Sequence, residues 1–337
     1  MEDTPQLNPV MYRAIITAVE YHLPARKLTN EQLESCFPEW PAQKIEEKLG
    51  ISNRHIAAGG ECSSDLAIKA AEKLFSRGAC CPSKIDFLLF CTQTPDYLLP
   101  TSACLIQERL GLPKSSGALD FSLGCSGYVY GLGLAKGLIE TGQARKVLLL
   151  TGETYSKLMR PDDKATRTLF GDAGTATLVE EGDQSETGQI GPFVYGTDGS
   201  GGEHLMVRQG GMRHPGPPLT DTGGLCMNGG EIFTFSVREV SRAVEALMER
   251  TGTNRDSIDL FIFHQANAYM LEFLRKKCRI PEEKFYTCFA TTGNTVSNTI
   301  PIALHHALAE DRIQSGSTVM FVGFGVGLSW GACLARF

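Results

Sequence analysis

Residues 85–91 of this 337-residue chain read IDFLLFC, and residues 258–264 read IDLFIFH. Each is a short, nearly all-apolar run, typical of a strand that is buried on both faces of a sheet. Apolar side chains at helical spacing precede both runs, so helices are predicted over 64–78 and 233–250. The near-identity of the two runs points to an internal repeat.

The repeat extends along most of the chain, at an offset that stays close to 170 residues. Matched segments predict a helix, a strand, a helix with a turn and a buried strand, and a closing strand. These pairs are 102–113 with 269–281, 118–123 with 285–292, 131–153 with 301–325, and 174–180 with 331–337. Alternating strands and helices predict a mostly parallel sheet covered by helices in each half.

The sequence therefore predicts an α/β protein made of two duplicated halves, 1–181 and 182–337. Between the repeated elements, residues 182–230 are rich in Gly, Pro and Asp. We expect this segment to be a long connection with irregular structure or an edge hairpin, and such connections are often functional.

Composition excludes several classes of protein. An apolar fraction of 42% is too high for a disordered chain, and a net charge of −6 argues against whole-chain binding to nucleic acid or an anionic membrane. The eleven cysteines form no C-x-x-C pair, no Cys/His spacing fits zinc, and no run approaches the ~18 apolar residues of a membrane span. The N-terminal residues lack a secretory signal, so we expect a reducing, cytoplasmic setting.

Cys125 is the first candidate for chemistry. It follows the predicted strand ALDFSL and precedes a predicted helix, with Gly124 and Gly127 on either side. Ligands bind beyond the carboxyl ends of strands in open α/β sheets, and a thiol at a helix N-terminus is favoured as thiolate. Most cysteines are inert core residues, but the setting of Cys125 favours a nucleophile.

The second half supplies the matching candidates. His264 ends the strand IDLFIFH, and Asn294 occupies the place that Cys125 has in the first half. By themselves, a buried histidine and an Asn after Gly are ordinary structural residues. If the halves pack about a pseudo-two-fold axis, all three converge on one site. The loop at 323–327 (GFGVG) could then bring backbone N–H groups to an oxyanion, and it does not fit a dinucleotide motif.

These motifs resemble the β-ketoacyl-acyl-carrier-protein synthase III family of thiolase-like condensing enzymes. The resemblance rests on DFSLGCSGYVYGL (120–132), FHQAN (263–267), FGDAGTA (170–176) and GFGVGLSWG (323–331) and covers nearly the whole chain. It implies an αβαβα sandwich of two five-stranded halves, a homodimer, and no cofactor besides thioester substrates.

The resemblance also implies roles for residues. Cys125 would take an acyl group from acyl-CoA, and His264 and Asn294 would stabilise the enolate formed when malonyl-acyl carrier protein loses CO₂. Backbone N–H groups of Cys125 and Val326 would form the oxyanion hole. Binding of CoA, pantetheine and the acyl chain would involve Trp40, Lys164, Asn267, Phe233 and Leu99. Docking of the carrier protein would involve Arg275, Lys276 and Lys277.

The chain departs from the family pattern at several positions around this site. Tyr269 stands where a basic residue is usual, and Gly230 and Thr234 replace an Asn and a Lys at the tunnel mouth. Either Lys44 or Lys48 could replace the usual Arg that contacts CoA. Leu99 stands where family members usually have a bulky residue that closes the partner's acyl pocket. Because leucine is a flexible aliphatic side chain, acyl groups longer than acetyl are expected to fit.

The leading hypothesis is decarboxylative Claisen condensation in fatty acid initiation. Its alternative is an acyl-CoA-dependent condensing enzyme of specialised metabolism, polyketide- or quinolone-like, with a different acyl donor or acceptor. Acyl transfer without carbon–carbon bond formation is disfavoured by the complete Cys–His–Asn set, and a cysteine hydrolase is disfavoured by the duplicated halves. A non-catalytic binding protein is the remaining alternative, and the intact motifs argue against it.

Overall fold

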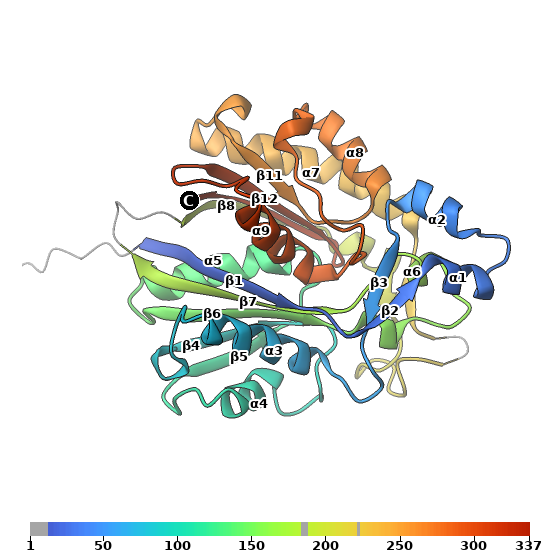
Figure 1. The fold of residues 1–337 in the computed structure, drawn as a ribbon, viewed down its shortest axis with the longest axis horizontal. Coiled ribbons are helices and arrows are strands. Elements are labelled where there is room, and N and C mark those ends of the chain that lie inside the picture. Colours follow the sequence, from blue (N-terminus) through green and yellow to red (C-terminus); the bar gives the residue numbers. More distant parts are fainter. Residues whose placement is uncertain (1–12, 183–187, 221–222) are drawn as a thin grey trace, which may run out of the picture.

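The computed structural model describes residues 13–182, 188–220 and 223–337, which form a layered α/β structure (Figure 1). Its centre is a nine-stranded sheet in the order β11-β12-β13-β8-β1-β7-β6-β4-β5. The strands are β1 (Arg13–His22), β4 (Phe87–Cys91), β5 (Gly117–Phe121), β6 (Lys146–Glu153), β7 (Ala173–Gly182), β8 (Gln189–Thr197), β11 (Leu260–Phe263), β12 (Thr318–Gly325) and β13 (Ser329–Arg336). Two small antiparallel sheets pair β2 (Arg26–Thr29) with β3 (Asn53–Ile56), and β9 (Leu205–Val207) with β10 (Leu225–Met227).

The strand pairing repeats along the chain. In the first half β4 is parallel to β6, β6 is antiparallel to β7, and β7 is antiparallel to β1. In the second half β11, β12, β13 and β8 pair in the same order and with the same orientations. The halves join where β1 meets β8, at Ile15 and Gln189. This topology confirms the predicted duplicated α/β fold, but the sheet is not mostly parallel as predicted, because five of its eight strand pairings are antiparallel. Among the described residues the second half contributes four strands to the sheet and not the five expected. The boundary at residue 181 stays a prediction.

Helices form the other layers. α5 (Gly127–Glu140) and α9 (Thr299–Ala309) contact strands of both halves and therefore lie between them. α3 (Ser63–Ser76) and α4 (Ser102–Arg109) cover the outer face of the first half, and α7 (Gly229–Thr251) and α8 (Ala268–Lys277) cover that of the second (Figure 1). The short helices α1 (Asn30–Cys36), α2 (Ala42–Leu49) and α6 (Lys164–Arg167) lie at one end of the sheet. None of the helices described is long and apolar enough to span a bilayer.

Three local expectations are corrected by the structure. Residues 285–292 form no strand: only Phe285 makes an isolated bridge, to Phe261. Part of 182–230 is β8, a central strand, and another part is the β9–β10 hairpin. Gly323–Gly325 end strand β12 and are not part of the loop that follows it.

Candidate active site

Cys125 lies between β5 and α5, in the tight turn that its flanking glycines were expected to allow. A Cβ on Gly124 would lie 2.6 Å from Gln93 Oε1 and 2.6 Å from Val326 Cγ1, and one on Gly127 would overlap the Cys91 sulfur. A side chain at either position would therefore force these neighbours to shift, and the thiol sits in a close-packed turn below the surface.

The protonation state of Cys125 differs from the sequence-based expectation. Burial, together with the nearby Glu153 carboxyl, raises the pKa of the Cys125 thiol well above its usual range, although a backbone hydrogen bond acts in the opposite direction. The position before helix α5 does not outweigh this loss of hydration. The resting nucleophile is therefore the thiol, and its proton must leave when sulfur attacks a substrate.

His264 directly follows β11, and its backbone N–H donates to Val322 O at 2.7 Å, which continues the parallel ladder to β12. Its imidazole is buried, lies edge-on to the Phe324 ring at 5.3 Å, and has Nδ1 2.7 Å from Thr299 Oγ1. Burial lowers the pKa of His264 to about 3, so the ring is neutral at physiological pH.

Asn294 belongs to the second half but is held by the first. Its backbone N–H donates to Leu169 O at 3.0 Å, and its carbonyl accepts from Gly171 N–H at 3.0 Å. The side-chain Oδ1 accepts from Val296 N–H at 2.9 Å, which directs Nδ2 toward His264 Nε2 at 3.3 Å. The FGDAG segment, recognised in the sequence only as a motif, thus positions the asparagine.

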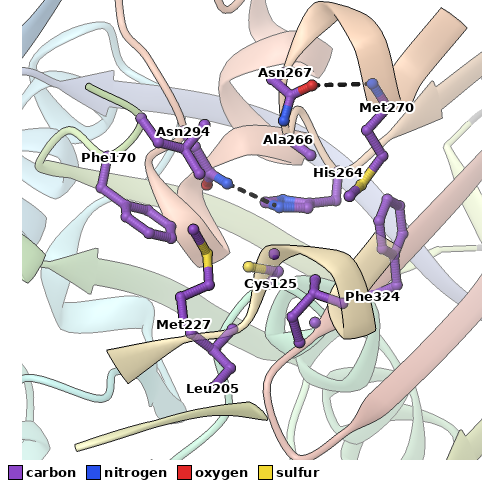
Figure 2. Close-up of a pocket in the computed structure, with 14 residues that line it drawn as sticks. Cys125, Phe170, Leu205, Met227, His264, Ala266, Asn267, Met270, Asn294 and Phe324 are labelled. Carbon is purple, nitrogen blue, oxygen red and sulfur yellow. Dashed lines mark hydrogen bonds between the residues drawn. The ribbon is translucent and has the colours of Figure 1, made fainter. Parts of the chain in front are cut away.

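Cys125, His264 and Asn294 line one cavity of about 100 Å³ (Figure 2). The structure brings them together from three segments, as the repeat predicted. The rest of the wall is largely apolar and includes Phe170, Met227 and Phe324, which Figure 2 labels. Such a wall suits an acyl chain.

Glu153 is a buried carboxyl that sequence reasoning missed. It ends β6 and accepts hydrogen bonds from Gln93 N–H at 3.1 and 3.2 Å, Thr94 Oγ1 at 3.1 Å and Ser297 Oγ at 3.3 Å. Burial raises the pKa of Glu153 to about 8 despite these donors. Because Gln93 and Thr94 belong to the first half and Ser297 to the second, this carboxyl links the two halves of the chain by hydrogen bonds.

The residues expected to contact CoA form a surface cluster. The Trp40 ring has Lys44 Nζ 4.4 Å and Lys164 Nζ 5.0 Å from its centroid, and Lys164 also pairs with Glu39 at 3.1 Å. Lys48 makes no such ring contact among the described residues. Two cations over an indole suit a ligand with an aromatic base and phosphates.

Asn267 lies at the cavity, whereas Phe233 on α7 does not line it. Asn267 lines the cavity and caps α8, with its Oδ1 accepting from Met270 N–H at 2.9 Å (Figure 2). Phe233 stacks on Tyr269 at 5.4 Å and meets Phe273 edge-on at 5.1 Å. Tyr269, which stands where a basic residue is usual in the family, therefore belongs to an aromatic cluster.

Other predicted residues are placed away from the cavity. Leu99 is 86% exposed and does not reach it. Arg275 and Lys276 form ion pairs with Glu272, at 2.8 and 2.9 Å, whereas no ion pair is found for Lys277 within the ranges described above. Much of the basic charge predicted for this helix end is therefore neutralised locally.

Two residues of the site carry no signal in a single sequence. Thr299 contacts the histidine from the start of α9, and Met227 lines the cavity from strand β10. A threonine at a helix start and a methionine in a Gly-rich segment are ordinary residues, so only their location in the fold reveals them.

Comparison with known proteins agrees with this architecture. Residues 119–199 match the family model "3-Oxoacyl-[acyl-carrier-protein (ACP)] synthase III", and residues 248–337 match the model of its C-terminal part. A Bacillus subtilis relative, β-ketoacyl-[acyl-carrier-protein] synthase III 2, is 37% identical over 97% of this chain and 99% of its own length. The chain belongs to the 3-oxoacyl-[acyl-carrier-protein] synthase III family. It is thus an enzyme, an acyltransferase of the condensing type.

Solved structures of this family superpose closely on the chain. A 3-oxoacyl-(acyl-carrier-protein) synthase III with 50% identity has a TM-score of 0.92 and covers 96% of this chain and 100% of its own. The enzyme from Pseudomonas aeruginosa PAO1, at 30% identity, has a TM-score of 0.88 with 96% and 98% covered. A priming β-ketosynthase of the R1128 polyketide pathway, at 27% identity, also has a TM-score of 0.88 and 99% coverage of both chains.

Proposed function

We propose that this synthase III transfers an acyl group from acyl-CoA to Cys125 and condenses it with malonyl-acyl carrier protein, the initiating condensation of fatty acid synthesis. One observation carries the proposal. A thiol, a neutral imidazole and a carboxamide from three distant segments meet at one apolar cavity. Family membership supplies the reaction class, and the cavity supplies the residues proposed to perform it.

In the first half-reaction the Cys125 sulfur attacks the thioester carbonyl. The new carbon–sulfur bond forms, the bond to the CoA sulfur breaks, and the thiol proton leaves with CoA as its thiol. Backbone N–H groups of Cys125 and Val326 are proposed to hold the tetrahedral oxyanion. In support, a Cβ on Gly325 would lie only 3.0 Å from Cys125 Sγ, so the end of β12 passes directly beside the nucleophile.

In the second half-reaction the malonyl group loses CO₂, and the enolate carbon attacks the acyl-Cys125 carbonyl. The enolate oxygen needs hydrogen-bond donors, and the Asn294 Nδ2 and a ring N–H of neutral His264 are proposed to supply them. Losing one such donor typically costs about 10²–10³ in rate. Apart from the two thioester substrates, the proposed mechanism uses only protein groups.

CoA is proposed to bind at the Trp40 cluster, with its adenine on the indole and its phosphates near Lys164 and Lys44. The contact of Lys44 with the ring favours it over Lys48. The pantetheine arm would then pass Phe233 and Asn267 to reach the cysteine. Asn267 lines the cavity and is proposed to hydrogen-bond an amide of that arm.

A second copy of the chain is the proposed partner at the β5 edge. β5 is the last strand of the sheet, and Leu119 on it and Leu98 and Leu99 beside it are exposed apolar side chains. Pairing of two such edges would cover them and carry Leu99 toward the other copy's acyl pocket. Analytical ultracentrifugation is expected to show a dimer, and L98E is expected to weaken it.

The acidic carrier protein is proposed to dock on the basic end of α8, where Lys277 and the ion-paired Arg275 and Lys276 lie away from the cavity. All eleven cysteines are free thiols, which suits the proposed cytoplasmic location.

The test separates the half-reactions. Intact mass detects acyl-Cys125 after incubation with acyl-CoA, and release of labelled CO₂ reports decarboxylation of malonyl-carrier protein. Cys125→Ala should abolish loading, with the exposed Cys104→Ala as its control. His264→Ala should load but fail to decarboxylate, whereas His306→Ala, outside the cavity, should do both. Absence of β-ketoacyl product with every acyl-CoA chain length would refute the proposal.

A further inference from the structure

The hydroxyl of Thr299 lies between two acceptor atoms. Thr299 is buried at the start of α9, with its Oγ1 2.7 Å from His264 Nδ1 and 3.1 Å from the carbonyl oxygen of Val296. A threonine hydroxyl carries one proton. It can therefore donate to the carbonyl or to the ring nitrogen, and not to both.

In the structure as it stands, the hydroxyl donates to Val296 O. Thr299 Oγ1 then accepts a hydrogen bond from His264, which places the ring hydrogen on Nδ1. A second contact requires the same tautomer. Because Asn294 Oδ1 accepts from Val296 N–H, its Nδ2 donates toward Nε2, which must be bare to accept. The free enzyme therefore holds His264 as an acceptor toward the cavity.

The proposed reaction needs the opposite arrangement. An enolate oxygen is stabilised by donors, and His264 can donate into the cavity only from an Nε2–H. A second ring proton is not a route to it, because burial keeps the ring neutral. The other neutral tautomer leaves Nδ1 bare, and a bare buried nitrogen needs a donor.

We propose that Thr299 is a positioning residue whose hydroxyl turns from Val296 O to His264 Nδ1 when a thioester oxygen enters the cavity, and so holds the Nε2–H tautomer. The inference rests on the proposed function. The ring gains one proton at Nε2 and loses one at Nδ1, both exchanged with water, so its charge does not change. Asn294 Nδ2–H and His264 Nε2–H then share the substrate oxygen as their common acceptor.

The tautomer can be measured directly. Nitrogen NMR of enzyme labelled at histidine distinguishes Nδ1–H from Nε2–H, and the variant His264→Asn assigns the resonance. The probe is the amide analogue of malonyl-pantetheine, which retains the carbonyl oxygen. Nδ1–H is expected in the free enzyme and Nε2–H in the complex. An unchanged Nδ1–H signal in the saturated complex would overturn the proposal.

Kinetics provide the second test. Thr299→Val removes the hydroxyl, so this residue can no longer donate to a bare Nδ1. Decarboxylation should fall by about 10²-fold, the loss of one oxyanion donor, while acyl loading of Cys125 persists. Thr299→Ser keeps the hydroxyl and should restore decarboxylation.

A matched control lies on the same segment. Thr295 is buried, and its Oγ1 has no hydrogen-bond partner among the described residues, so Thr295→Val makes the same chemical change without touching His264. It should leave both half-reactions unchanged. Wild-type decarboxylation in Thr299→Val, or equal loss of loading and decarboxylation in Thr299→Val and Thr299→Ser, would assign Thr299 a purely structural role. Failure of the wild type to form acyl-Cys125 would instead contradict the proposed function, and the tautomer signal of the free enzyme would still be measured.

Discussion

Replacing Gly325 by alanine should disable the nucleophile by crowding it. The added Cβ would lie 2.9 Å from Cys125 Cβ and 3.0 Å from its Sγ, whereas carbon atoms in ordinary contact are about 3.5–4.0 Å apart. Either β12 or the cysteine must therefore shift by roughly 0.5–1 Å. Overpacking of this kind costs about 1–3 kcal/mol of stability. A reacting atom displaced by about 1 Å costs roughly 10²-fold in rate.

The assay is the time course of acyl-Cys125 formation from acyl-CoA, followed by intact mass, together with a thermal melt. Gly137→Ala is the matched control. Gly137 is exposed on α5, an added Cβ there meets no atom within 4 Å, and the change should stabilise the helix by about 0.5–1 kcal/mol without altering loading. If Gly325→Ala loads at the wild-type rate, β12 does not pass beside the thiol, and the proposed oxyanion geometry fails.

Three further predictions concern pH, CoA and chain length. His264 is neutral when folded, with a pKa of about 3, but its ordinary value is 6.5, so the unfolded chain alone takes up a proton as pH falls through this window. The wild type should thus lose more free energy of unfolding than His264→Asn between pH 6.5 and 4.5, by up to about 1.4 kcal/mol per pH unit in urea titrations; parallel curves would contradict the burial argument. Lys44→Ala should raise KM for acyl-CoA more than Lys48→Ala with kcat unchanged, and equal effects would leave the ring contact without a role. A series of acyl-CoA donors should extend beyond acetyl because Leu99 is flexible, and strict acetyl preference would count against this.

Local sequence patterns predicted much of the fold correctly. The helices at 63–76, 229–251 and 299–309 and the buried strands β4, β6, β11 and β12 match their predictions within a few residues. Such elements are signalled by apolar periodicity, which depends only on neighbours along the chain. The repeat then predicted which segments correspond, and so which three residues meet.

The failures have physical causes. β8 contains Gly191 and Pro192, which argue against a central strand, but both lie at a register shift opposite Leu334, where a missing N–H is tolerated. Residues 285–292 have strand-like composition, yet only Phe285 pairs with β11. β1, which joins the halves, was not predicted at all. Strand formation depends on partners distant in sequence, and periodicity does not reveal them.

The sequence by itself determined the repeat, the strand–Gly–Cys–Gly–helix turn at Cys125 and the matching places of His264 and Asn294. Only the tertiary structure decided their protonation. A helix start predicted a thiolate, but burial beside Glu153 keeps the cysteine protonated, and burial keeps His264 neutral. The hydroxyl of Thr299 against the ring likewise comes from packing. Charge states depend on the loss of water and on partners brought from elsewhere in the chain, and these exist only once the chain is folded.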